Sequence, residues 1–130
     1  MKIYLAGPFF NDEEKELVKK LESFLESKNH QVFSPSRDGG IIKKDAPVIE
    51  RVKIVAENVG CIRWCDMVIA IIDGKDTGTI WEQGYAYGIN KKIIAFTNKN
   101  YTLNIMLAQT VESFARNLEE LDKLLDGYQN

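Results

Sequence analysis

Short apolar runs alternate with longer amphipathic segments along this chain of 130 residues. Several of the runs are rich in β-branched residues and end at turn-forming or polar residues, a pattern typical of buried strands. The predicted strands are residues 2–6, 31–33, 67–72, 92–97 and, more weakly, 111–115. Between them, apolar side chains recur at helical spacing. The predicted helices are residues 12–28, 47–65, 79–89, 117–126 and a short one at 103–109.

Strands that alternate with helices predict a parallel sheet with helices on both faces, the doubly wound α/β fold. The length fits a single domain over residues 1–130. Asn11 and Glu14 form a capping-box pattern at the start of the first helix. The polar segments 7–11, 34–40 and 73–78 each follow a strand, and residues 36–46 are expected to form a loop. Ligands of such folds bind beyond the carboxyl ends of the strands, so these segments should surround the site.

The composition narrows the range of partners. Hydrophobic residues make up 45% and charged residues 28%, the balance of an ordinary globular protein. With 17 basic and 19 acidic residues, the formal charge is −2, so neither nucleic acid nor an anionic membrane is expected as a partner. No apolar stretch has the length of a membrane span or of a signal peptide, and we expect a cytoplasmic protein.

Few side chains are available for histidine or cysteine chemistry. His30 is the one histidine, and it falls in a polar helix–strand junction where a solvated side chain is expected. Cys61 and Cys65 are expected to be buried, reduced thiols on one helical face. A zinc site is therefore hard to assemble, and we expect neither a metal nor an organic cofactor. Acid–base chemistry would have to come from carboxylates, tyrosine or lysine.

Familiar phosphate-binding patterns are missing. The sequence has neither a G-x-G-x-x-G nor a G-x-x-x-x-G-K-[ST] motif, which excludes the usual dinucleotide and P-loop sites. The exit of the first strand reads "AGPFF", with no acidic residue before Asp12, which argues against a phosphoacceptor receiver domain. The same exit is not the Ser/Thr-rich loop that a flavodoxin-type electron carrier would use.

The stretch "DTGTIWEQGYA", residues 76–86, places Asp76 and Glu82 on either side of a glycine-containing loop. Two interpretations are open for Glu82. Thr79 and Glu82 fit a capping box, in which the glutamate reaches back to the backbone of the capping residue. Alternatively, Glu82 is a reactive carboxylate at the mouth of a pocket. The pair Asp73-Gly74 is typical of a turn.

Taken together, the ordered motifs resemble the nucleoside 2-deoxyribosyltransferase family over most of the chain. The resemblance rests on "IYLAGPFF" (3–10), "VFSP" (32–35), "WCDMVIAIID" (64–73), "DTGTIWEQGYA" (76–86) and "LNIM" (103–106). It implies a five-stranded parallel sheet in the flavodoxin-like order. It also implies transfer of 2-deoxyribose between nucleobases through a covalent glutamate ester, with net retention by two inversions.

The resemblance assigns a role to several residues. Glu82 would be the nucleophile, Tyr4 the hydroxyl that orients it, and Asp76 the anchor of the sugar hydroxyls. Asn104 would reach the sugar 5′-hydroxyl in a neighbouring subunit's site, which implies a homo-oligomer.

The base would be held at the same edge. Phe9 and Phe10 lie where the family places ring-stacking residues, and two adjacent aromatic residues after a Gly-Pro turn cannot both point into a core. Asp73 and Gly78 are further candidates for substrate binding. One departure concerns the family's Asn-Asp pair that contacts the base, because the aligned residues here are Glu57 and Asn58. Asn58 either binds the base without protonating it, or Glu57 or another residue supplies the proton, since an amide is not a general acid.

Two alternative functions remain at this stage. One is an N-glycosidase of deoxynucleoside 5′-monophosphates, which would use the same nucleophile. A carboxylate at Asp76 repels a 5′-phosphate, so Asp76 and Asn104 favour unphosphorylated nucleosides. The other is a non-catalytic nucleoside or nucleotide sensor, against which the presence of Tyr4, Asp76 and Glu82 counts.

Overall fold

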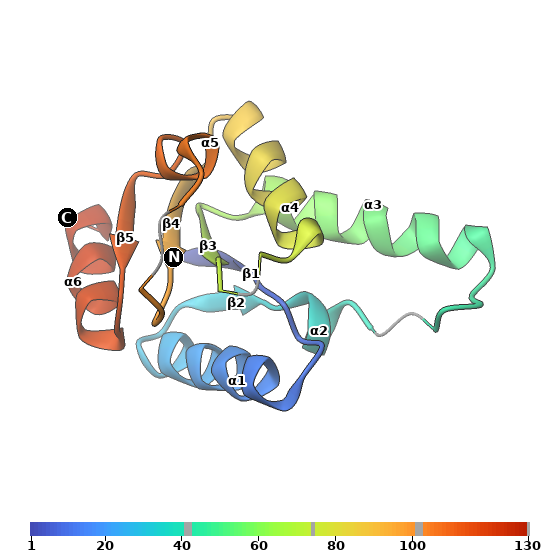
Figure 1. The fold of residues 1–130 in the computed structure, drawn as a ribbon, viewed down its shortest axis with the longest axis horizontal. Helices are drawn as coiled ribbons and strands as arrows, with labels where there is room; N and C mark the ends of the chain where they lie inside the picture. Colours follow the sequence, from blue (N-terminus) through green and yellow to red (C-terminus); the bar gives the residue numbers. More distant parts are fainter. Residues whose placement is uncertain (41–42, 74, 101–102, 130) are drawn as a thin grey trace.

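The computed structural model describes residues 1–40, 43–73, 75–100 and 103–129. Its centre is a five-stranded, all-parallel sheet in the order β2-β1-β3-β4-β5 (Figure 1). The strands are β1 (Lys2–Ala6), β2 (Gln31–Phe33), β3 (Met67–Ile71), β4 (Lys92–Phe96) and β5 (Ser113–Ala115). The helices are α1 (Asp12–Ser27), α2 (Pro35–Asp38), α3 (Val48–Trp64), α4 (Thr77–Gly88), α5 (Ile105–Ala108) and α6 (Leu118–Gln129). The predicted doubly wound fold and strand order are confirmed.

Two hydrophobic clusters separate the faces of the sheet. Alternate residues of a strand point to opposite faces, so Ile3 and Leu5 of β1 pack with α1 and α6. Tyr4 and Ala6 pack on the other face, in a cluster with residues of α3 and α4. β3 is buried at every position, as its unbroken apolar sequence predicts for a central parallel strand.

Side-chain caps mark the starts of α1 and α4. Asn11 and Glu14 form the predicted reciprocal capping box at α1. The expected cap of α4 is wrong: the helix begins at Thr77, and Asp76 is its N-cap, accepting a hydrogen bond from the backbone N–H of Thr79. Glu82 is therefore not the reciprocal partner of a Thr79 cap.

Two local expectations are also corrected. Part of the predicted 36–46 loop is the short helix α2, which Pro35 starts and whose Asp38 accepts from the backbone N–H of Ser34. Residues 41 and 42 of that loop, and Gly74 of the predicted Asp73-Gly74 turn, lie outside the described part of the chain.

His30 is buried rather than solvated, and its Nδ1 accepts a hydrogen bond from the Met1 amino group at 3.0 Å. Burial and the neighbouring amino group lower the pKa of His30.

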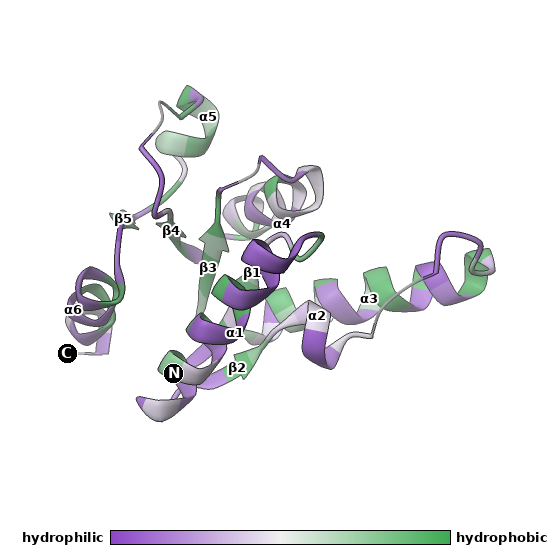
Figure 2. Cartoon of the chain, turned by 60° about the horizontal axis from the view of Figure 1, so that its bottom comes forward, coloured by the Kyte–Doolittle hydropathy of each residue, from purple (hydrophilic) through white to green (hydrophobic). Residues whose placement is uncertain are grey.

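The long helix α3 extends beyond the sheet. Its amino-terminal half projects away from the body of the molecule in both ribbon views (Figures 1 and 2). Val48, Ile49, Val52 and Val55 are all more than half exposed there. The carboxyl-terminal half packs against the sheet through the fully buried Ile62. Part of α3 thus presents an apolar surface to solvent. In the described residues, no helix is long and apolar enough to cross a membrane.

Candidate active site

The site is centred on a hydrogen bond between a buried tyrosine and a half-buried glutamate that are far apart in sequence. Tyr4 lies in the middle of β1 with 0% of its surface exposed. Its hydroxyl donates a hydrogen bond to Oε2 of Glu82, in the second turn of α4. The Tyr4 ring stacks on Phe33 of the neighbouring strand β2, with centroids 5.6 Å apart. A rigid strand and a ring stack therefore fix the hydroxyl that holds the Glu82 carboxylate.

Burial changes the acidity of both groups. Desolvation raises the pKa of Glu82 to about 7, with a further rise from the nearby Asp76 charge, while the hydrogen bond from Tyr4 opposes the shift. The pKa of the Tyr4 hydroxyl is raised as well, first by burial and then by the Glu82 charge. Tyr4 thus stays protonated and donates. Glu82 is a carboxylate whose charge costs free energy in the folded protein, a property common at functional sites.

Asp76 lies beside this pair at the start of α4. Its Oδ2 accepts from the backbone N–H of Thr79 at 2.9 Å and from the Thr79 hydroxyl at 2.8 Å. Thr79 is 2% exposed, so the contact fixes the position of the Asp76 carboxylate. Both bonds use one oxygen, and among the described residues the other, Oδ1, has no donor and can accept from a ligand hydroxyl.

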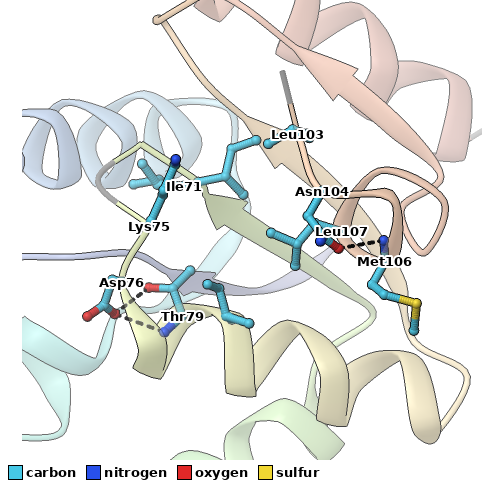
Figure 3. Close-up of a pocket in the computed structure, with 10 residues that line it drawn as sticks. Ile71, Lys75, Asp76, Thr79, Leu103, Asn104, Met106 and Leu107 are labelled. Carbon is cyan, nitrogen blue, oxygen red and sulfur yellow. Dashed lines mark hydrogen bonds between the residues drawn. The ribbon is translucent and has the colours of Figure 1, made fainter. Parts of the chain in front are cut away.

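A cavity of about 360 Å³ opens between the start of α4 and α5. Figure 3 shows Asp76 and Thr79 on one side of it and Asn104 on the other. Asn104 is the N-cap of α5, and its Oδ1 accepts from the backbone N–H of Met106 at 2.8 Å. The amide nitrogen of Asn104 therefore remains as a donor. Asp76 and Asn104 of the same chain therefore line one cavity. Asp76 supplies a hydrogen-bond acceptor and Asn104 a donor, a combination suited to a ligand with several hydroxyl groups.

A second cavity, of about 240 Å³, lies between α3 and α4 and is lined by Glu82. The other lining residues are Val55, Asn58, Val59, Ile62, Gly78 and Trp81. Asn58 Oδ1 is buried and has no hydrogen-bond partner in the described structure. This oxygen lies against Gly39 at the end of α2, and an unpaired buried oxygen is costly to the fold. The lining of Glu82, Asn58 and apolar side chains fits a planar, hydrogen-bonding ligand.

Three predicted substrate contacts lie elsewhere. Phe9 lines a cavity between α1 and α2, while Phe10 is 74% exposed and stacks on Phe9 with centroids 5.6 Å apart. Asp73 is buried, accepts from the Thr97 hydroxyl, and lines a cavity beside α1. The structure thus brings Tyr4, Asp76, Glu82, Asn58, Gly78 and Asn104 around the start of α4, but not Phe9, Phe10 or Asp73.

Sequence reasoning missed two residues of this region. Thr79 supports the Asp76 carboxylate rather than capping the helix itself. Trp81 lines the Glu82 cavity, and its place next to Glu82 in the sequence was the available signal. Within the described residues, no group of three or more His, Cys, Asp or Glu side chains could hold a metal ion.

The protein is thus a flavodoxin-like α/β protein with a glutamate of raised pKa, Glu82, on the helix that follows the central strand. A family model described as nucleoside 2-deoxyribosyltransferase matches residues 3–120. A 2-deoxyribosyltransferase from the psychrotolerant bacterium Bacillus psychrosaccharolyticus is 31% identical, with a TM-score of 0.87 over 94% of this chain and 90% of that one. The chain therefore belongs to the nucleoside 2-deoxyribosyltransferase family.

Two further structures share the fold. A conserved protein from Enterococcus faecalis V583 is 19% identical with a TM-score of 0.77, over 93% of this chain and 94% of that one. A CMP N-glycosidase from Clostridium botulinum is 22% identical with a TM-score of 0.65, over 97% and 99% of the two chains. A comparison with curated protein sequences gives no match. Family membership indicates an enzyme that acts on nucleosides.

Proposed function

We propose that the protein is a single-domain, cytoplasmic enzyme of nucleotide salvage that transfers 2-deoxyribose between nucleobases. Glu82 is its nucleophile. The observation that carries this proposal is the half-buried Glu82 carboxylate, which accepts a hydrogen bond from the Tyr4 hydroxyl, lines a cavity and has a raised pKa. A carboxylate with a raised pKa and a fixed orientation is suited to attack an anomeric carbon. Family membership supplies the substrate class.

The reaction has two displacements. An ionised Glu82 oxygen forms a bond to C1′ of the deoxynucleoside, and the glycosidic C1′–N bond breaks with its electron pair going to the base. The second base then attacks C1′ through a ring nitrogen, and the bond between C1′ and the Glu82 oxygen breaks to release the carboxylate. The attacking base loses its N–H proton to solvent. Each step inverts C1′, so the product nucleoside retains the original configuration.

The neighbouring residues hold the partners of this reaction. Tyr4 orients the carboxylate, because its hydroxyl has a single donor and the strand fixes it. Asp76 accepts from a sugar hydroxyl through Oδ1, while Oδ2 stays bonded to Thr79. The negative charge of Asp76 disfavours a 5′-phosphate in the same cavity, which favours nucleosides over nucleoside monophosphates.

Asn58 binds the base without acting as an acid. Its side chain lines the Glu82 cavity, and an amide can donate or accept a hydrogen bond but has no acidic proton. Glu57 is exposed and does not line the Glu82 cavity. The leaving base therefore takes its proton from solvent, so its own acidity should govern its departure.

The functional form is a homo-oligomer. Beside the exposed residues of α3, Ile105 and Met106 of α5 are 74% and 68% exposed. Met106 lines the first cavity and Val55 of α3 lines the second, so a second copy of the chain that covers these apolar side chains would border both cavities. Asn104 stands next to Ile105, so the same association would bring it to a neighbouring subunit's site.

The test is a base-exchange assay. Purified protein is incubated with deoxyinosine, with and without adenine, and the products are separated by chromatography. Deoxyadenosine that forms only when adenine is present supports the transferase. Release of hypoxanthine at the same rate with and without adenine would instead establish an N-glycosidase. Glu82→Gln should abolish both. Glu112→Gln is the control, because Glu112 is exposed and its side chain bonds to none of the described residues.

A further inference from the structure

The aromatic side chain lining the Glu82 cavity is Trp81, not one of the two phenylalanines. Trp81 directly precedes the proposed nucleophile on α4, and it lines the cavity together with Glu82 and Asn58. Phe9 lines a different cavity and Phe10 is 74% exposed outside both. An aromatic contact to a base in this cavity would therefore come from Trp81 of α4.

The Trp81 ring is held in place from behind. Tyr85, one helical turn further on, stacks on it with centroids 5.5 Å apart and an interplanar angle of 5°. Tyr85 is in turn fixed by Arg63 of α3, whose Nε donates to the tyrosine hydroxyl at 2.6 Å. The Arg63 guanidinium also lies 5.9 Å from the Tyr85 ring. This stack spans α3 and α4 and orients the indole without covering all of it.

Trp81 nevertheless stays 55% exposed. Within the described part of the chain, Tyr85 is the one ring that stacks on it, and no cation lies over it. A large, oriented and solvent-exposed indole that shares a cavity with the Asn58 side chain is suited to a flat ligand with polar groups at its edge.

We propose that Trp81 is the stacking surface for the nucleobase, which lies against the indole while Asn58 contacts its edge. This proposal rests on the proposed function and specifies its substrate class. Stacking on an indole grows with the π surface of the base, so purine 2′-deoxynucleosides are the preferred substrates over pyrimidine ones.

Fluorescence tests the contact without turnover. The chain has two tryptophans, so Trp64→Phe leaves Trp81 as the single reporter, and Glu82→Gln prevents reaction. Titration with adenine or hypoxanthine should quench the remaining emission and saturate, with weaker binding of cytosine. Binding of adenine seen by calorimetry with no change in this emission would overturn the proposal. Because free bases need no turnover, the titration decides the point even if the wild-type enzyme transfers nothing.

Kinetics provide the second test. Trp81→Leu should raise KM for deoxyinosine about 10- to 100-fold and reduce the preference for purines, whereas Trp81→Phe should restore most of the affinity. Tyr87→Leu is the matched control, since Tyr87 is a similarly exposed aromatic residue of α4 that lines neither cavity. A Trp81→Leu enzyme with unchanged KM would refute the stacking role. A Trp81→Leu enzyme that becomes monomeric and loses kcat at unchanged KM would also refute the stacking role, because Trp81 would then be an interface residue.

Discussion

Replacing Glu82 by glutamine should stabilise the protein at pH 8 much more than at pH 5. The folded pKa of Glu82 is about 7, above its ordinary value of 4.5, because burial penalises the charged form. The folded state therefore binds more protons than the unfolded state between these two values. Stability contributed by the protonated form is lost as the pH rises from about 4.5 to 7. Glutamine resembles the protonated carboxyl group and never has to ionise.

The size of the effect follows from the two pKa values. A shift of 2.5 pKa units, from 4.5 to about 7, corresponds to about 3 kcal/mol at pH 8, where the wild-type side chain is ionised in both states. At pH 5 only the unfolded carboxyl group is largely ionised, and the same linkage gives about 1 kcal/mol. The gain from Glu82→Gln should thus grow by roughly 2 kcal/mol between pH 5 and pH 8.

Urea denaturation of the wild type and of the Glu82→Gln variant at both pH values measures this difference. All other titrating groups are common to the two proteins, so the difference isolates Glu82. Glu112→Gln should change the free energy of unfolding by less than about 0.5 kcal/mol at either pH, as exposed substitutions usually do. An equal gain at pH 5 and pH 8, or a loss of stability at pH 8, would refute the reasoning about Glu82 burial.

Three further predictions concern the reaction. The value of kcat/KM should rise with pH through about 7 as Glu82 ionises. Tyr4→Phe should move this rise to higher pH, because the hydrogen bond from Tyr4 lowers the Glu82 pKa. A pH–rate profile of both proteins measures the shift. Asp76→Ala should lower the free energy of unfolding by about 1 kcal/mol, because the helix cap is lost. Asp76→Ser should keep the cap but still weaken sugar binding. Denaturation measures the first effect and KM the second. Asn58→Asp should make the rate less dependent on the acidity of the leaving base, because a carboxyl group can donate a proton. A series of deoxynucleosides gives the slope of log rate against the pKa of the leaving base. An unchanged slope would contradict the role given to Asn58.

Much of the fold could be predicted because strand and helix patterns are local. The bounds of β1 and β2 follow directly from apolar runs that end at Gly7 and Ser34. The N-cap of α4 could not be decided from the local sequence. Asp76 stands three residues before Thr79, and Thr79 stands three residues before Glu82, so either residue could be the cap. The buried Thr79 hydroxyl bonds to Asp76, and this contact decides in favour of the aspartate.

The site was less accessible to sequence reasoning. Tyr4 and Glu82 are 78 residues apart, and their contact follows from the sheet and helix packing rather than from any local motif. The family resemblance drew attention to both, but the raised pKa of Glu82 depends on desolvation, which no sequence pattern reveals. Phe9 and Phe10 lie outside the two cavities beside α4, and their predicted contact with the base stays a prediction.

The most direct test of the central claim is to locate the covalent intermediate. Wild-type protein reacting with deoxyinosine is quenched in acid, digested, and its peptides are analysed by mass spectrometry. The account predicts one added deoxyribosyl group, as an ester, on the peptide that contains Glu82, and none in the Glu82→Gln variant. A deoxyribosyl group on another peptide, or hypoxanthine release by Glu82→Gln at the wild-type rate, would contradict it.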